Sequence, residues 1–260
     1  MVRSLRIAAA FTTLLTACEP AAAPPTPRRP PSATPTPAPK TPVGLQHQTR
    51  RVLGTEVDAE VFIADLRQLR LVALEGRGDG RLGARVDVLR AENDALVAVN
   101  GTFFARNGAP LGLLVNDGTE LNPLRNADWG VLEVNATGHA RLVHTRDYVP
   151  SPHAEFAVQC GPRVVIEGTV PRLKPQSADR TALCVRAPTE VALVVTRGPV
   201  QADTLGTWLA APAEQNGLAC TDALLLDGGP STQLSASAGG LQMELPGGWA
   251  VPNGVGLQPR

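Results

Sequence analysis

The residue best suited to catalysis is Asp227, a carboxylate at the end of an apolar run and directly before two glycines. The segment is Leu224-Leu225-Leu226-Asp227-Gly228-Gly229-Pro230-Ser231-Thr232. The run predicts a buried strand, and the glycines let backbone amides approach a ligand or let the chain turn sharply. A carboxylate partly shielded from water can act as a general acid, or stay ionised and orient a water molecule. A cap of the turn by Asp227 itself fits these residues equally well.

Arg180 could bind a phosphate or a carboxylate. It precedes the apolar run 181–186, and a guanidinium at a strand end can hold an oxyanion with two parallel hydrogen bonds. The alternative is a surface ion pair with the neighbouring Asp179. Residue type alone does not decide between them, because the chain has 22 arginines and most must be ordinary surface charges.

A third polar segment, Asn100-Gly101-Thr102-Phe103-Phe104, follows the apolar run 95–99. An amide, a glycine and two aromatic rings at a strand end could line a sugar-binding pocket. A turn stabilised by Asn100, with both phenylalanines in the core, is equally consistent with the spacing.

The segment 78–83 matches the GxGxxG pattern of dinucleotide-binding sites and lies between a predicted strand and a predicted helix, as such a site requires, but two residues do not fit one. The position about twenty residues on, where a carboxylate should bind a ribose, is Asn100. Asp79 would repel a pyrophosphate. We therefore predict a glycine-rich turn that enters a helix.

Metal and serine-hydrolase chemistry find little support. No two of Cys160, Cys184 and Cys220 have a C-x₂₋₄-C spacing, and the four histidines form no HExxH pattern. We predict no structural metal and no cofactor; a divalent cation could bind near Asp227, but no ligand cluster supports one. Ser231 is not in a G-x-S-x-G elbow, so a serine-hydrolase triad is not favoured.

These residues are expected to be positioned by a sheet-dominated fold. Short β-prone runs occupy residues 61–66, 69–74, 95–99, 156–160, 163–166, 181–186, 191–196 and 223–226. Helical spacing predicts helices over 82–93 and 204–216, the second with Asp203 as its N-cap and interrupted by Pro212. We therefore predict a single α+β domain, strand-rich and mixed, over residues 43–260.

The amino terminus is typical of an exported lipoprotein. Arg3 and Arg6 precede the apolar run 7–17, which is too short to span a bilayer, and Leu15-Thr16-Ala17-Cys18 resembles a bacterial lipobox. We predict a signal peptide over 1–18 with Cys18 lipidated; a free cysteine in an ordinary signal peptide is the alternative. Ten of the 24 prolines fall within 19–42, which predicts a proline-rich tether. Together they form a disordered lipoprotein leader.

Export and charge restrict the partners. An oxidising compartment allows one disulfide among Cys160, Cys184 and Cys220, with all three pairings open. Residues 1–42 carry five basic groups and one acidic group, so residues 43–260 hold 19 basic and 23 acidic groups. A mildly acidic domain does not predict nucleic-acid binding.

Membrane contact is expected through the lipid anchor only, with the domain facing the periplasm or the exterior. The outer membrane is preferred because Glu19 is not the aspartate linked to inner-membrane retention.

Taken in order, six motifs resemble those of the phosphodiester glycosidase family over roughly residues 60–257. They are NGTFF at 100–104, Pro110-Leu111-Gly112-Leu113-Leu114-Val115 with Asp117-Gly118, Cys160-Gly161-Pro162-Arg163-Val164-Val165, Arg180-Thr181-Ala182-Leu183, Asp227-Gly228-Gly229-Pro230-Ser231 and Val251-Pro252-Asn253. Two departures concern the substrate: Thr102 replaces a second glycine, and Leu225 replaces an asparagine that often precedes LDGG.

The resemblance implies an exported hydrolase that cleaves the glycosidic bond of sugar-1-phosphodiesters in envelope or extracellular glycans. Arg180 would hold the phosphate, and Asp227 would act on water or on an oxocarbenium-like transition state. Asp179 is the nearest candidate for a second carboxylate. The substrate-binding residues would be Asn100, Gly101, Phe103, Phe104, Thr181, Gly228, Gly229, Ser231 and Asn253. The alternatives are a non-catalytic glycan-binding envelope lipoprotein and a phosphodiesterase that cleaves the P–O bond.

Overall fold

The computed structural model describes residues 41–260. The predicted signal peptide, its lipidation site Cys18 and nearly all of the predicted tether lie outside the described residues. Within 41–260, no helix has the length and apolar character needed to cross a membrane.

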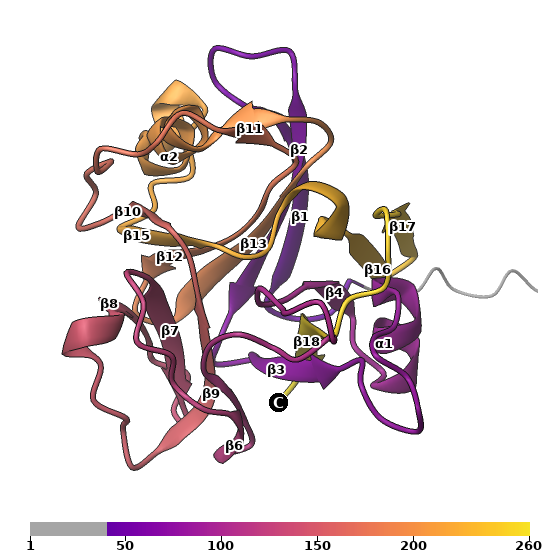
Figure 1. Ribbon diagram of the computed structural model, residues 1–260. Coiled ribbons are helices and arrows are strands. Elements are labelled where there is room, and N and C mark those ends of the chain that lie inside the picture. The colour runs from indigo at the N-terminus through magenta and orange to yellow at the C-terminus, as the bar shows by residue number, and fades with distance from the viewer. Residues whose placement is uncertain (1–40) are drawn as a thin grey trace, which may run out of the picture. The chain divides into compact units, whose positions relative to one another are not determined.

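Strands predominate in this part of the chain (Figure 1). The helices are α1 (Val86–Glu92) and α2 (Ala202–Ala210), with short 3-10 turns η1 (Thr145–Asp147), η2 (Ala213–Gln215) and η3 (Gly229–Ser231). The strands are β1 (Leu45–Arg51), β2 (Asp58–Asp65), β3 (Leu69–Glu75), β4 (Val97–Asn100), β5 (Leu114–Asn116), β6 (Thr119–Asn122), β7 (Gly130–Asn135), β8 (Ala140–His144), β9 (Ala154–Cys160), β10 (Arg163–Val165), β11 (Ser177–Ala178), β12 (Thr181–Ala187), β13 (Glu190–Thr196), β14 (Val200–Gln201), β15 (Asp222–Leu225), β16 (Leu234–Ala238), β17 (Leu241–Leu245) and β18 (Asn253–Pro259). Each of the eight predicted runs forms a strand, and the predicted α+β class is confirmed.

The strands form three main sheets, all with antiparallel pairing. A six-stranded sheet has the order β1-β2-β13-β12-β15-β10, and two five-stranded sheets have the orders β17-β16-β4-β18-β3 and β6-β5-β9-β7-β8. β11 and β14 make a separate pair. Figure 1 shows the six-stranded sheet in the upper and central part of the view, the sheet that contains β7 and β9 at the lower left, and the sheet that contains β3, β4 and β18 at the right.

The largest hydrophobic core contains side chains from all three sheets. β13 shows how the sequence produces this arrangement: Leu193 and Val195 point into the shared core, whereas Ala192 and Val194 point to a second core beneath α2. Since both faces of such strands are buried, their sequences are continuous apolar runs rather than alternating ones.

Helix α2 covers the outer face of the six-stranded sheet with Leu205, Trp208 and Leu209. It is shorter than the predicted 204–216, because Pro212 has no amide hydrogen to continue the helix, and the chain forms η2 instead. Its N-cap is Gln201. Asp203, the predicted cap, lies in the first turn.

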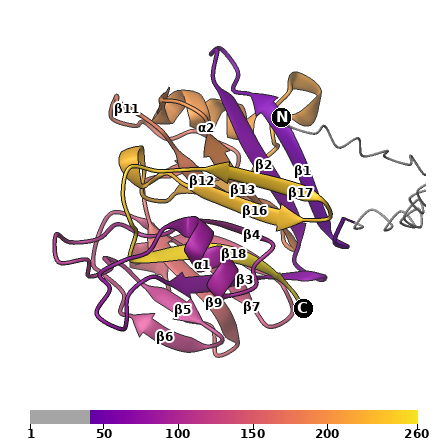
Figure 2. The same ribbon diagram turned by 90° about the vertical axis from the view of Figure 1, so that its right-hand side faces the viewer.

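Helix α1 covers the outer face of the sheet that contains β4 and β18 (Figure 2). It begins at Val86, four residues later than predicted, and Leu82 is 62% exposed. The segment 78–83 forms a tight turn in which the Arg81 amide donates to the Gly78 carbonyl at 2.8 Å. The predicted glycine-rich turn is therefore present, but the helix starts only after it.

A disulfide joins Cys184 on β12 to Cys220, just before β15, and Cys160 is a buried free thiol. This resolves the three pairings that the sequence left open. Burial raises the pKa of the Cys160 thiol to about 12, so this thiol is neutral and shielded from reagents in the folded protein.

Removal of the disulfide is expected to lower stability without changing the pocket. The bond closes a loop with a sequence separation of 36, for which loop-closure entropy gives about 4 kcal/mol of stabilisation. A Cys184→Ala, Cys220→Ala double variant should therefore unfold at a temperature lower by roughly 10 °C, measured by calorimetry. Cys160→Ala controls for the loss of a buried sulfur elsewhere. Equal melting temperatures of the double variant and the parent would contradict the expectation.

Candidate active site

A pocket of about 400 Å³ lies at the end of β15, where Asp227 follows the strand. Its walls come from four separate parts of the chain: the segments after β4, after β9, before β12 and after β15. The lining residues are Phe103, Gly161, Pro162, Gln176, Ala178, Arg180, Leu225, Leu226, Asp227, Gly228, Gly229 and Pro230.

Asp227 is a partly buried carboxylate on the wall of this pocket. Burial raises its pKa, and hydrogen bonds from Ser231 and the Gly228 amide partly oppose the rise. The Gly228 amide donates to Oδ1 of Asp227 at 3.0 Å. A carboxyl with a raised pKa can accept a proton more readily than an exposed aspartate, which suits it to proton transfer with water or substrate.

Asn100 fixes the backbone beneath Asp227. Its Nδ2 donates to the Asp227 carbonyl at 2.6 Å, and its Oδ1 accepts from the Thr181 hydroxyl at 2.6 Å and the Gln233 amide at 3.1 Å. The Asp227 amide in turn donates to the Gly101 carbonyl at 3.0 Å. Asn100 and Thr181 are fully buried and do not line the pocket. Both were expected to contact substrate, and the structure instead makes them positioning residues.

Asn253 plays a similar part for the loop after β4. Its Oδ1 accepts from the Thr102 amide and its Nδ2 donates to the Thr102 hydroxyl, both at 2.9 Å. Asn253 is buried and does not line the pocket, so it is also unsuited to the predicted contact with a sugar. Thr102, which replaces a glycine of the family pattern, thus forms hydrogen bonds to Asn253 through both its amide and its hydroxyl.

Gly101 lies against Asn253, and its replacement is expected to disturb the site. A Cβ atom at Gly101 would lie 1.9 Å from Oδ1 of Asn253. Gly101→Ala must therefore displace Asn253 and the loop that carries Phe103. We expect a stability loss of about 1–3 kcal/mol, typical of overpacking, and reduced activity. Urea unfolding measures the first effect, with Gly198→Ala as control because its Cβ would meet only ordinary contacts at 3.6 Å. If Gly101→Ala unfolds at the same urea concentration as the parent, Asn253 can move aside without cost and the expectation is wrong.

Arg180 is a buried cation that lines the pocket, with 6% of its surface exposed. Backbone carbonyls hold its guanidinium: Nε donates to Val200 at 3.1 Å and Nη2 donates to Gln176. A Cβ atom at Gly228 would lie 3.9 Å from Nη1, so this nitrogen lies toward the glycine turn. The alternative from the sequence, a surface ion pair with Asp179, is absent among the described residues, because Arg180 is buried and its guanidinium donates to carbonyls instead.

Asp227 and Arg180 line one pocket without neutralising each other. Neither contributes to the other's pKa shift, and no ion pair joins them. Burying a cation without a carboxylate partner is unfavourable, which indicates that an anionic ligand completes the site. The pocket of about 400 Å³ that both side chains line can hold such a ligand.

The amides of Gly228 and Gly229, which the sequence allowed to approach a ligand, form hydrogen bonds within the protein. The Gly228 amide donates to Asp227, and the Gly229 amide donates to the Asp179 carbonyl at 2.8 Å. Both amides are thus engaged within the protein. Glycine is required here for another reason: a Cβ at Gly228 would lie 2.9 Å from the Asp179 carbonyl, and Gly229 has φ of 58°.

Of the two adjacent phenylalanines, Phe103 lines the pocket and Phe104 does not. The Phe103 ring lies 5.1 Å from the Trp129 ring, tilted by 55°. Phe104 instead packs against the core under α1, outside the lining of this pocket. Ser231 is fully buried and accepts a hydrogen bond from Nε1 of Trp249 at 2.9 Å. Its hydroxyl forms a hydrogen bond with the Asp227 carboxylate.

Asp179 is not placed to be a second catalytic carboxylate. Ala178 and Arg180 line the pocket, but Asp179 between them does not, and only its backbone carbonyl contacts the turn. Asp227 is the one acidic residue in the lining of this pocket. Among residues 41–260, no three histidine, cysteine, aspartate or glutamate side chains gather as a metal site would require.

Sequence reasoning missed Gln176, Trp129 and Trp249. They lie on loops between strands, and no local pattern distinguishes them, although Gln176 and Trp249 lie shortly before the motifs that begin at Arg180 and Val251. Gln176 contributes a backbone carbonyl, which any residue type could supply.

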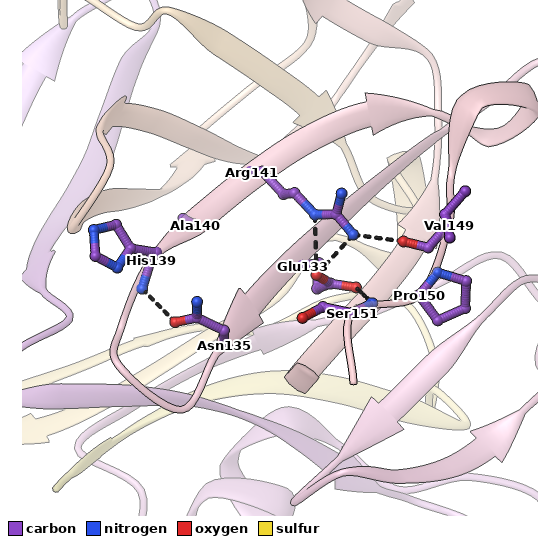
Figure 3. A pocket seen from close by; sticks show the side chains of 8 residues that line it. All are labelled: Glu133, Asn135, His139, Ala140, Arg141, Val149, Pro150 and Ser151. Atoms are coloured by element: carbon purple, nitrogen blue, oxygen red, sulfur yellow. Dashed lines mark hydrogen bonds and ion pairs between the residues drawn. The ribbon is translucent and has the colours of Figure 1, made fainter. Parts of the chain in front are cut away.

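A second cavity, of about 450 Å³, lies apart from this site on β7, β8 and the loop after η1 (Figure 3). Its buried carboxylate, Glu133, accepts hydrogen bonds from Arg141 at 3.0 Å, Tyr148 at 2.8 Å and the Ser151 amide at 3.2 Å. Because this carboxylate is fully paired inside the protein, it is structural.

The fold is that of a known class of antiparallel α+β domains. The catalytic domain of zebrafish N-acetylglucosamine-1-phosphodiester alpha-N-acetylglucosaminidase, auto-inhibited by its pro-peptide, is similar with a TM-score of 0.68 at 15% identity, over 85% of this chain and 87% of that chain. A hypothetical protein from Synechocystis is similar with a TM-score of 0.64 at 15% identity, over 83% of this chain. This chain spans 62% of the Synechocystis protein. No curated protein matches the sequence.

The sequence model of the phosphodiester glycosidase family matches residues 93–258, well over half of the chain. The chain belongs to the phosphodiester glycosidase family. The match includes Asn100, Arg180, Asp227 and Asn253.

Proposed function

We propose that this protein hydrolyses the glycosidic bond of sugar-1-phosphodiesters. The observation that carries the proposal is the pairing of an unneutralised buried arginine with a partly buried carboxylate in one pocket. The similar zebrafish enzyme is named for a sugar-1-phosphodiester, which supports this substrate class.

Arg180 binds the phosphodiester. Its guanidinium is fixed by two carbonyls, so little reorganisation is needed when the anion arrives. As the bond between C1 and the phosphate oxygen breaks, negative charge grows on that oxygen. Arg180 stabilises this charge, and the phosphate monoester leaves as an anion that needs little proton donation.

Asp227 acts on the other side of the anomeric carbon, in its ionised form. It accepts a proton from water as the water oxygen bonds to C1, and it stabilises the positive charge of an oxocarbenium-like transition state. The products are the free sugar and a phosphate monoester. One carboxylate suffices because the leaving group requires little acid assistance, which agrees with Asp227 being the one acid in the pocket lining.

We also propose that the protein is an exported lipoprotein anchored through Cys18. The disulfide between Cys184 and Cys220 supports an oxidising compartment. Labelling of the bacterial host with an alkyne fatty acid tests the anchor: a labelled band that is absent in Cys18→Ser supports it, and a band of equal intensity contradicts it.

Product analysis in water enriched in heavy oxygen tests the reaction. The full-length protein is incubated with methyl phosphodiesters of common sugars, and the products are identified by mass. Heavy oxygen in the released sugar supports cleavage at C1. Heavy oxygen in the phosphate would instead indicate a phosphodiesterase. Binding without turnover across the panel would indicate a non-catalytic glycan-binding protein.

A further inference from the structure

A second compartment, also of about 400 Å³, adjoins the pocket that contains Asp227. The two are continuous, because they share the lining residues Phe103, Gly161, Pro162, Gln176 and Arg180. Asp227 lines only the first. The residues that line only the second include Asp128, Trp129, Arg172, Lys174 and Ala202.

The second compartment has an excess of positive charge. Arg172 and Lys174 lie on the exposed segment between β10 and β11, and no side chain among residues 41–260 forms an ion pair or hydrogen bond with either. The nearby carboxylate, Asp128, is engaged by His144 at 2.8 Å, and that hydrogen bond lowers the Asp128 pKa. The compartment therefore presents two unpaired cations besides Arg180.

Arg180 lies at the junction of the two compartments, and this fixes the direction of a bound substrate. If Arg180 holds the phosphate, the sugar must extend toward Asp227 for C1 to be reached. The alcohol on the other side of the phosphate then enters the second compartment, toward Trp129, Arg172 and Lys174. The leaving group is thus the part of the substrate that meets these cations.

We propose that the second compartment selects phosphodiesters whose leaving alcohol carries a further negative charge, as a phosphate or a carboxylate. The two cations would each form charge-assisted contacts with such a group, whereas a neutral alcohol would leave them solvated and unused. This inference rests on the proposed function for the orientation of the substrate. The affinity of the compartment for the leaving group can be measured without turnover.

The first test measures binding of two product-like ligands, ethyl phosphate and propane-1,3-diyl bisphosphate, to the full-length protein by calorimetry. We expect the bisphosphate to bind about tenfold more tightly, with the difference lost in Arg172→Gln, Lys174→Gln. The control is Arg67→Gln, Arg81→Gln, which removes the same charge from exposed turns outside both compartments and should keep the preference. No preference in the parent, or one that survives in the first variant, would overturn the proposal.

The second test compares kcat/KM for sugar-1-phosphodiesters of propanol and of 3-phosphopropanol. A preference for the charged alcohol that depends on Arg172 and Lys174 supports the inference. Hydrolysis of both esters at equal rates would overturn it and leave the proposed function intact. If neither ester is cleaved but the bisphosphate still binds through Arg172 and Lys174, the proposed function is overturned and the charge preference of the second compartment stands.

Discussion

Replacing Asp227 with asparagine is expected to lower kcat about a thousandfold and to leave a folded, more stable protein. Asparagine keeps an oxygen that can accept from the Gly228 amide but cannot accept a proton from water or stabilise a cationic transition state. Loss of a positioned general base lowers kcat by about a thousandfold. The KM should change little, because the phosphate contact with Arg180 remains.

The stability change follows from the raised pKa of Asp227. Burial raises this pKa above its ordinary value of 3.8, so the carboxyl favours the folded state in its neutral form. The neutral carboxyl makes its full contribution to the free energy of unfolding below pH 3.8. This contribution is lost as the pH rises through the raised pKa of Asp227. At neutral pH, Asp227→Asn should therefore unfold at a higher urea concentration than the parent, and the advantage should vanish in acid.

A matched control is available at the opposite end of the strand that Asp227 follows. Asp222 opens β15, has a pKa that burial also raises, and lines neither compartment. Asp222→Asn should shift stability in the same direction at neutral pH and keep full activity. The parent's activity should fall as the pH drops through the Asp227 pKa, above pH 3.8. Retention of activity in Asp227→Asn would refute the assigned role.

Replacing Arg180 with alanine is expected to lower kcat/KM by about 10²- to 10³-fold, as for other lost donors to a developing oxyanion. Arg180→Lys should retain little more activity than Arg180→Ala, since one ammonium cannot donate to the Gln176 and Val200 carbonyls and also bind phosphate.

The dependence of rate on the leaving group distinguishes this role from a structural one. If Arg180 stabilises the departing phosphate, the loss should shrink for esters whose phosphate monoester is more acidic and leaves more readily. Rates across a series of such esters should therefore vary more steeply in Arg180→Ala than in the parent. If the rates of Arg180→Ala and of the parent depend equally steeply on the acidity of the leaving group, and the variant melts at a lower temperature, Arg180 only supports the fold.

Eight of the 18 strands within residues 41–260 were predicted, and each lies in an apolar run of the local sequence. Ten were missed. They include β7, although its residues are mostly apolar and buried, and β16 and β18, whose residues are small and do not favour strands. Gly254 shows the cause: a Cβ there would lie 2.6 Å from the Val99 carbonyl, so close packing between β4 and β18 requires glycine. That requirement comes from a partner strand distant in sequence.

The candidate site was predictable in its members but not in their orientations. Asp227, Arg180 and Phe103 line the pocket as expected, with Gly228 and Gly229. Asn100 ends β4 and Asn253 begins β18, yet the side chains of both are buried and form hydrogen bonds within the protein. A motif shows that a polar residue lies at a strand end, whereas the direction of its side chain depends on the neighbouring strands.

The hydrogen bonds around Asn100 and Asn253 also determine when during folding the site can exist. They join residues 127 and 151 positions apart in the chain, and β18, which carries Asn253, lies between β3 and β4. Pairing between such distant segments forms slowly and late. Until residues 253–259 have taken their place in the sheet, the loop of residues 100–103 lacks the hydrogen bonds that Asn253 supplies to Gly101 and Thr102. Catalytic competence should thus appear together with global folding, and a nascent or truncated chain that lacks this segment should be inactive.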